Sequence, residues 1–184
     1  MRKINEIFYS LQGEGYHTGT PAVFVRFSGC NLRCPFCDTR HEEGKPMSDD
    51  EIVAAVCAYP CSMVILTGGE PSLWIDEAFV SRLHAAGKYV CIETNGTHAL
   101  PDGIDWVTCS PKEGAPLAIS RMDELKVVYT GQPLEAYAAY AALPASYHFL
   151  QPCSCQNTAE VVGYILAHPT WRLSLQTHKL IHIQ

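Results

Sequence analysis

SMVILTGGEP, residues 62–71, is the stretch that decides the fold of this chain. Its first part is a short apolar run that predicts a buried strand, and its paired glycines predict a turn after that strand. A helical pattern follows over residues 75–87, and another apolar run at residues 89–93 predicts a second strand. Strand, helix and strand at this spacing favour a βαβ unit, and therefore a parallel sheet.

The same alternation continues on both sides of this unit. Three further helices are expected at residues 49–59, 133–142 and 158–168, and Ser48 and Glu51 form a capping box at the start of the first. Further strands are expected at residues 22–27, 106–109, 125–129, 147–150 and 172–175. Because these helices are too few for a closed barrel of eight strands, we predict an α/β fold: a partial, open β/α barrel with a mostly parallel sheet and few helices. The prediction places residues 1–184 in a single domain.

The composition is that of a globular chain. Hydrophobic residues make up 47% of the 184 residues and charged residues 17%, and the formal net charge is −6. A nucleic-acid backbone prefers a basic face, so no nucleic-acid partner is expected. No apolar run approaches the roughly 18 residues of a membrane span, and the first residues lack the apolar core of a signal peptide. We therefore expect a cytoplasmic location and no membrane partner.

Nine cysteines are present, and an odd number argues against a secreted disulfide scaffold. Cys30, Cys34 and Cys37 lie within eight residues in a Cys-x3-Cys-x2-Cys pattern. A 4Fe–4S cube normally takes four cysteine ligands, so three would leave one iron open, as a catalytic cluster requires. The alternative is a structural zinc site, which usually presents Cys-x2-Cys pairs. No second pair of that spacing is present, and the pattern favours the cluster.

The other cysteines are assigned no ligand role. Four lie in apolar contexts and are interpreted as small buried hydrophobic residues: Cys57, Cys61, Cys91 and Cys109. Cys153 and Cys155 lack the neighbours that an auxiliary cluster would need, and we interpret them as bystanders.

Polar, glycine-bearing loops follow several of the expected strands. Because the carboxyl ends of parallel strands meet at one edge of a sheet, these loops predict a single rim and a single site. The loops are residues 30–39, 67–71, 93–96, 110–112 and 176–179.

The cysteine pattern followed by Gly68-Gly69-Glu70-Pro71 resembles the radical S-adenosylmethionine (SAM) superfamily. In that superfamily three cysteines bind a 4Fe–4S cluster, SAM chelates the open iron, and the glycine loop contacts the amino group of SAM. The resemblance implies a partial barrel of the radical SAM type. It also implies that Cys30, Cys34 and Cys37 hold the cluster and that Gly69 contacts SAM.

Further blocks from one end of the chain to the other resemble the 7-carboxy-7-deazaguanine synthase family of the queuosine (7-deazapurine) pathway. These blocks are NEIF at 5–8, LQGEGY at 11–16, FVR at 24–26, CDT at 37–39, SPK at 110–112 and LQTHK at 175–179. The resemblance implies a lyase that converts 6-carboxytetrahydropterin to 7-carboxy-7-deazaguanine and releases ammonia, with SAM as a regenerated cofactor and a requirement for Mg²⁺. We also expect a homodimer and an electron donor such as flavodoxin or ferredoxin.

The resemblance further implies roles for individual residues. Those expected at the substrate are Leu11, Gln12, Gly13, Glu14, Arg26, Thr67 and His178. Arg26 ends an apolar strand, where a planar guanidinium can bind a carboxylate through two nitrogens; the alternative is an internal ion pair, for example with Glu14 or Glu93. The side chains of Gln12 and Glu14 suit the donor and acceptor edge of a pterin, and the alternative is a surface turn. For His178 the alternative is a structural histidine.

The residues expected at SAM are Gly69, Glu70, Glu93, Ser110, Pro111, Lys112 and Gln151. Glu70 and Glu93 either bind ribose hydroxyls or cap a helix start. Thr39 matches the position that ligates Mg²⁺, an ion that keeps several waters and takes few protein oxygens.

Two other functions stay open at this point. One is a radical-generating activase that removes hydrogen from a glycine of a partner protein, which would have no use for Arg26, Gln12 and Glu14 as a clamp on a carboxypterin. The other is a non-catalytic iron–sulfur or zinc protein, which would bind metal without cleaving SAM.

Overall fold

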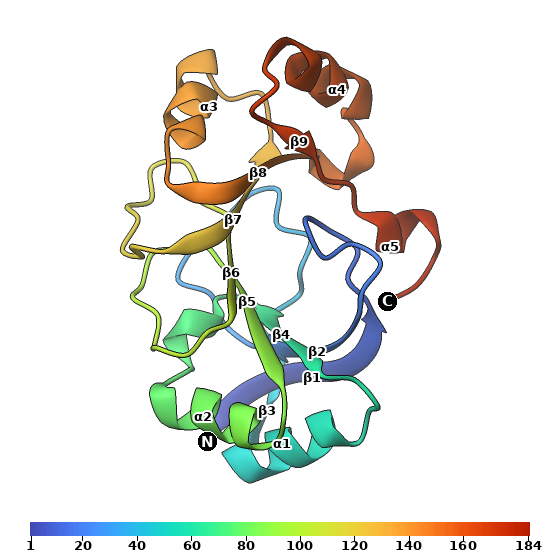
Figure 1. Ribbon diagram of the computed structural model, residues 1–184, viewed down its shortest axis with the longest axis vertical. Helices are drawn as coiled ribbons and strands as arrows, with labels where there is room; N and C mark the ends of the chain where they lie inside the picture. The colour runs from blue at the N-terminus through green and yellow to red at the C-terminus, as the bar shows by residue number, and fades with distance from the viewer.

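A computed structural model describes residues 1–184 and shows one curled, open sheet with helices at its periphery (Figure 1). Its nine strands follow the order β3-β1-β2-β4-β5-β6-β7-β8-β9. They are β1 (Arg2–Leu11), β2 (Pro21–Phe27), β3 (Lys45–Met47), β4 (Met63–Gly68), β5 (Tyr89–Thr94), β6 (Trp106–Cys109), β7 (Met122–Tyr129), β8 (Ala145–Pro152) and β9 (Arg172–Leu173). Every neighbouring pair from β2 to β9 is parallel, which confirms the predicted open, mostly parallel α/β fold.

The four expected helices are present within a few residues of their predicted bounds. They are α1 (Asp49–Cys57), α2 (Glu77–Ala85), α3 (Leu134–Ala141) and α4 (Thr158–Ala167), and a single helical turn, α5 (Thr177–Leu180), follows β9. The capping box forms as predicted, with Ser48 and Glu51 each accepting the other's backbone N–H. None of the helices combines the length and hydrophobicity that crossing a bilayer requires.

The antiparallel edge of the sheet was not predicted. β1 pairs antiparallel with both β2 and β3, and its register shifts between Ile4 and Glu6. Polar residues interrupt the apolar alternation of β1, so its strand character depends on the neighbouring strand rather than on a local pattern. This strand leads the chain into the loop at residues 12–20, which folds over the open side of the barrel.

Alternation along the strands separates a packed outer face from an inner one. Residues such as Val25, Leu66 and Val127 point outward and join a cluster of 24 buried hydrophobic residues beneath the helices. The inner face holds a smaller apolar cluster near the start of the strands: Ala22, Phe24, Met63, Ile65 and Cys91. Further along, the inward positions become polar and form one layer at the carboxyl ends: Arg26, Thr67, Glu93, Thr108, Lys126 and Gln151. The period of two of a strand therefore places the polar layer opposite the core.

The two ends of the curled sheet are joined by loops rather than by strand pairing. The backbone N–H of Thr177 donates to the carbonyl of Gly13 at 2.9 Å, and the N–H of Gly15 donates to Oγ of Ser174 at 2.9 Å. The C-terminus lies beside β1, where Oγ of Ser10 donates to the carbonyl of Gln184 (Figure 1). The loop at residues 12–20 and the C-terminal segment together close the gap between β1 and β9.

The burial predicted for four of the cysteines is confirmed for two of them. Cys91 and Cys109 are buried as expected, but Cys57 is exposed at the end of α1 and Cys61 is half-buried, so the prediction is wrong for these two. Cys57 faces solvent because the buried face of α1 is formed by Ile52 and Val56. All nine cysteines are free thiols.

Candidate active site

A cavity of about 410 Å³ opens at the carboxyl ends of the parallel strands, where the sequence predicts the rim. It collects most of the residues expected at the site. Those in its lining are Gln12, Glu14, Arg26, Cys30, Cys34, Cys37, Thr39, Thr67, Gly69, Glu93, Ser110, Lys112, Gln151 and His178. Leu11, Gly13, Glu70 and Pro111 lie outside the lining.

The glycine loop packs backbone against backbone on the start of the cysteine loop. Gly69 donates its N–H to the carbonyl of Phe27 at 3.1 Å, and Glu70 donates to the carbonyl of Gly29 at 2.9 Å. A Cβ atom on Gly69 would lie 1.9 Å from the Gly29 oxygen, so only glycine permits this approach. The contact places the loop after β4 directly beside the cysteines that follow β2.

The three clustered cysteines share one wall of the cavity. Cys30 Sγ accepts the N–H of Leu32 at 3.4 Å, and Cys37 donates its N–H to the carbonyl of Cys34 at 3.1 Å. A structural zinc ion would need four ligands around one centre. A cube instead engages each thiolate through a different iron, and three free thiols on one wall fit that donor set.

Glu70 is fully buried behind the cavity. Its Oε1 accepts from the N–H of Ser72 at 3.0 Å and from Oγ1 of Thr94 at 2.6 Å. Its Oε2 accepts from the N–H of Asn95 at 2.7 Å. These bonds tie the loop after β4 to the loop after β5 and favour the helix-start alternative for Glu70, whose carboxylate caps the 3-10 helix η1 (Pro71–Leu73).

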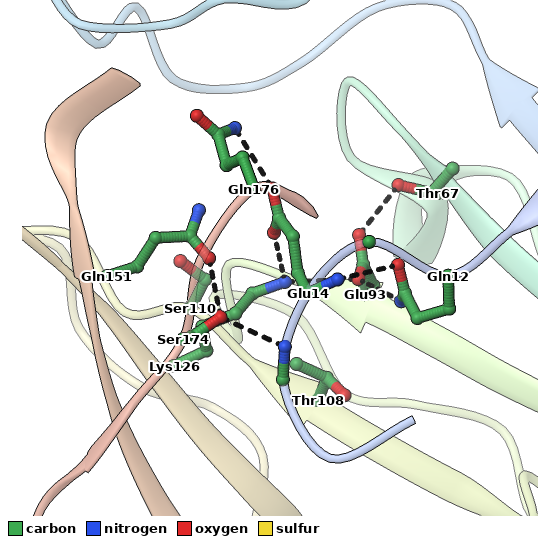
Figure 2. Close-up of polar contacts among 12 residues, drawn as sticks. Gln12, Glu14, Thr67, Glu93, Thr108, Ser110, Lys126, Gln151, Ser174 and Gln176 are labelled. Atoms are coloured by element: carbon green, nitrogen blue, oxygen red, sulfur yellow. Dashed lines mark hydrogen bonds and ion pairs between the residues drawn. The ribbon is translucent and has the colours of Figure 1, made fainter. Parts of the chain in front are cut away.

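An ion cluster around the buried Lys126 forms the inner wall, with Glu14 and Glu93 half-buried beside it (Figure 2). Lys126 Nζ lies 2.6 Å from Oε2 of Glu14 and 3.1 Å from Oε1 of Glu93. Gln12 Nε2 donates to Oε1 of Glu93 at 3.0 Å, and Thr67 Oγ1 donates to its Oε2 at 3.1 Å. Burial raises the pKa of Glu93, but the Lys126 ammonium and these hydrogen bonds outweigh it and hold the pKa below its usual value. Glu93 is therefore an ionised member of an internal network.

Arg26 faces the cavity and makes an ion pair, although not with the predicted partners. Its Nε donates to Oε1 of Glu6 at 2.7 Å, so an internal ion pair does form, but with Glu6 in place of the example partners Glu14 and Glu93. Glu6 is available because the antiparallel pairing of β1 with β2 sets it opposite Arg26. The terminal nitrogens of the guanidinium form no hydrogen bond within the protein, so their donors remain for a ligand.

The C-terminal segment joins the wall that contains Glu14. Gln176 Nε2 donates to Oε1 of Glu14 at 2.9 Å (Figure 2). The same nitrogen donates to Oδ2 of Asp38 at 3.0 Å. Lys179 Nζ lies 2.6 Å from the same Asp38 oxygen. The His178 ring rests against Gly13, because a Cβ on that glycine would lie 2.1 Å from Nδ1 of His178. Asp38 thereby links the cysteine loop to the C-terminal segment.

Three residues expected at SAM, Ser110, Lys112 and Gln151, follow β6 or end β8 and line the same cavity. Lys112 Nζ donates to the carbonyl and to Oγ of Ser110, both at 2.6 Å, and burial lowers the pKa of Lys112. Gln151 is buried, and its Oε1 accepts from Oγ of Ser174 at 2.8 Å. Cys153, interpreted as a bystander, joins the lining beside Gln151.

Sequence reasoning missed Lys126, Glu6, Asp38 and Gln176 as site residues. A usable signal existed for Lys126, which interrupts the apolar run at residues 125–129. An unpaired charge in such a strand is costly, and the same reasoning led to Arg26. Glu6 carried no such signal, because only the unpredicted pairing of β1 brings it to Arg26.

Comparison with known proteins identifies the family. Residues 24–136 of the chain match the protein family described as "Radical SAM superfamily". A protein of Bacteroides thetaiotaomicron named 7-carboxy-7-deazaguanine synthase is 71% identical over 184 residues, which cover 100% of both chains. The chain belongs to the 7-carboxy-7-deazaguanine synthase family. A second member, from Nitratidesulfovibrio vulgaris, is 43% identical over 213 residues, with 98% of each chain covered.

A solved structure supports the same placement within the 7-carboxy-7-deazaguanine synthase family. The crystal structure of QueE from Escherichia coli shares 29% sequence identity with the chain and superimposes with a TM-score of 0.78, covering 95% of this chain and 93% of that one. Membership in the radical SAM superfamily implies a 4Fe–4S cluster and SAM, and it confirms that the chain is an enzyme. A non-catalytic metal protein is thereby excluded.

Proposed function

We propose that this chain converts 6-carboxytetrahydropterin to 7-carboxy-7-deazaguanine with release of ammonia. The observation that carries the proposal is the meeting of the cysteine loop, the glycine loop and the polar layer on a single cavity. The names of the full-length relatives support the same reaction, since they are called 7-carboxy-7-deazaguanine synthases. The activase alternative is weaker, because that reaction has no use for Arg26 or for the polar network around Glu14.

The substrate would lie along the wall formed by Arg26, Gln12 and Glu14. The free terminal nitrogens of Arg26 can bind the substrate carboxylate in a fork, while Glu6 fixes the other side of the guanidinium. Along the edge of the pterin ring, the amide of Gln12 can donate and accept hydrogen bonds, and the carboxylate of Glu14 can accept them. Thr67 and His178 border the same space and would complete the contacts.

The cluster would be held by Cys30, Cys34 and Cys37, and SAM by the adjoining Gly69, Ser110, Lys112 and Gln151. When bound, the cluster and SAM supply the radical that removes a hydrogen atom from the substrate carbon bearing the carboxylate. The chain's own part is to orient the two ligands and to exclude water from the space between them. Glu93 could reach the ribose hydroxyls only through lone pairs that Lys126, Gln12 and Thr67 leave free.

The reaction would also require Mg²⁺, an electron donor and a second copy of the chain. Thr39 lines the cavity beside the cysteines, and its hydroxyl could ligate Mg²⁺ together with substrate oxygens. An electron donor such as flavodoxin or ferredoxin would reduce the cluster. The active form would be a homodimer, which light scattering of the cluster-loaded protein can test.

The test is anaerobic turnover of reconstituted protein with dithionite, SAM, Mg²⁺ and 6-carboxytetrahydropterin, followed by mass spectrometry. We expect 7-carboxy-7-deazaguanine to form without stoichiometric loss of SAM, and omission of Mg²⁺ to lower the rate. The matched controls are Cys34→Ser, which removes a cluster ligand, and Gly163→Ala, which lies in α4 with open space around it. Formation of 5′-deoxyadenosine alone would keep the radical SAM assignment but reject the substrate.

A further inference from the structure

Of the two lysines that line the cavity, Lys126 is the one whose ammonium contacts carboxylates. It projects from β7, its side chain is only 6% exposed, and its Nζ contacts two carboxylates from other parts of the chain. Glu14 belongs to the loop that follows β1, and Glu93 belongs to β5. Lys126 therefore joins three segments that no backbone pairing connects at this point (Figure 2).

The surrounding charges make this ammonium necessary for the ionised state of the wall. Glu14 and Glu93 both approach Nζ of Lys126, so the two carboxylates lie close to each other. Glu124 faces Lys126 from the same strand, and Lys112 faces it from the loop after β6. Without Lys126, like charges in a poorly solvated wall would repel, and one carboxylate would bind a proton instead.

Protonation of Glu14 would remove a hydrogen-bond acceptor that the N–H groups of a pterin need. Oε1 of Glu14 already accepts from Gln176 at 2.9 Å, and Oε2 accepts from Lys126 at 2.6 Å. An ionised carboxylate has further lone pairs for the N–H donors of a ligand, whereas a protonated one turns one oxygen into a donor. Burial lowers the pKa of Lys126, but Glu14, Glu93 and Glu124 outweigh it and raise the pKa above its usual value, so the ammonium is permanent.

We propose that Lys126 is a positioning residue for substrate binding: it holds Glu14 and Glu93 side by side as carboxylates, so that Glu14 can accept the N–H donors of the pterin. The inference deepens the proposed function and rests on it. It assigns Lys126 no contact with the substrate; Lys126 acts through Glu14.

The test compares Lys126→Met and Lys126→Arg with the control Lys88→Met. This control loses the same charge outside the cavity, at a half-buried lysine whose Nζ donates to the Cys61 carbonyl. Substrate affinity is measured anaerobically on the cluster-loaded protein from about pH 6 to about pH 8, alongside iron content, kcat and KM. We expect Lys126→Met to bind about tenfold or more weakly near neutral pH, mainly through KM, with unchanged iron content. Its affinity should recover as the pH rises, because the carboxylates lose their extra proton.

Two variants keep the inference falsifiable. Lys126→Arg keeps the charge and should bind within about threefold of the wild type, with the same pH profile. The double variant Lys126→Met/Glu93→Gln removes one positive and one negative charge, so its substrate affinity should not show the new pH dependence. If Lys126→Met alone does not fold, the pH profiles of substrate affinity for the double variant and for Glu93→Gln are compared instead. A pH profile of Lys126→Met parallel to that of the wild type would overturn the inference. Wild-type protein that binds no pterin would instead contradict the proposed function.

Discussion

The imidazole of His178 lies on the backbone of Gly13, so closely that a Cβ atom on Gly13 would stand 2.1 Å from its Nδ1. The two residues come from opposite ends of the chain and meet because Thr177 donates both its N–H and its hydroxyl to the Gly13 carbonyl at 2.9 Å. The position of His178 in the wall that would face the substrate thus requires glycine at residue 13.

Gly13→Ala should therefore displace His178 and separate the C-terminal segment from the loop at residues 12–20. We expect kcat/KM for the pterin to fall by about tenfold to a hundredfold, because catalysis depends on placement to within about 1 Å. Iron content after reconstitution should change much less than kcat/KM, since the C-terminal segment bonds to Asp38 of the cysteine loop but to none of the three cysteines. Steady-state kinetics checks this, with Gly163→Ala as the control, whose Cβ meets no atom within 4 Å. Wild-type kinetics in Gly13→Ala would show that the wall can shift without consequence.

Gly69→Ala should disturb the other side of the cavity. Its Cβ would lie 1.9 Å from the Gly29 carbonyl oxygen, so the glycine loop and the start of the cysteine loop must move apart. We expect reduced iron and sulfide content after reconstitution, and SAM binding weakened by about tenfold or more. Iron analysis, visible absorbance and equilibrium binding of SAM measure both effects. Full cluster content together with wild-type SAM affinity would contradict the prediction.

Arg26→Lys should test whether the guanidinium needs both its Nε contact to Glu6 and its free terminal nitrogens. One ammonium cannot both keep the Nε contact to Glu6, now 2.7 Å, and present a two-pronged donor to a carboxylate. We expect KM for the substrate to rise by about tenfold, with a smaller change in kcat. The matched comparison is Glu6→Gln, which retains a hydrogen-bond acceptor and should show the weaker effect. A larger defect in Glu6→Gln than in Arg26→Lys would mean that the ion pair itself, rather than the free nitrogens, matters.

Glu124 gives a prediction for the pH dependence of stability. It is buried on the inner face, where burial raises its pKa despite the nearby Lys126, and it accepts the N–H of Tyr16 at 3.1 Å. Because the folded pKa lies above the unfolded one, this group stabilises the fold at low pH, and the contribution is lost as the pH rises through the folded pKa.

Glu124→Gln is neutral at every pH and can still accept from Tyr16. Its melting temperature should therefore increase relative to that of the wild type between about pH 5 and about pH 8, by on the order of 2 °C. Anaerobic thermal melts across that range measure the difference. A difference that stays constant, or that shrinks as the pH rises, would count against the burial of an ionisable Glu124 as its cause.

The sequence predicted much of the fold because the parallel part of the sheet is encoded locally. The strand predicted at residues 62–66, the glycines after it and the capping box at Ser48 are each specified by neighbours in the chain, and the structure has them all, with β4 at Met63–Gly68. β1 escaped prediction because its polar residues are tolerated only beside β2. The same locality explains the cysteine loop, whose ligands lie within eight residues.

By itself, then, the sequence determined the order of the parallel strands and of the four longer helices, the cysteine and glycine loops, and the rim on which these loops gather, since each depends on neighbours in the chain. Only the tertiary structure decided the partners within the site. The pairing of Lys126 with Glu14 and Glu93, the ion pair of Arg26 with Glu6 and the seat of His178 on Gly13 join residues far apart in sequence. Such contacts are set by strand register and by the closing of the barrel, and a side chain's charge alone does not specify which of several opposite charges it meets.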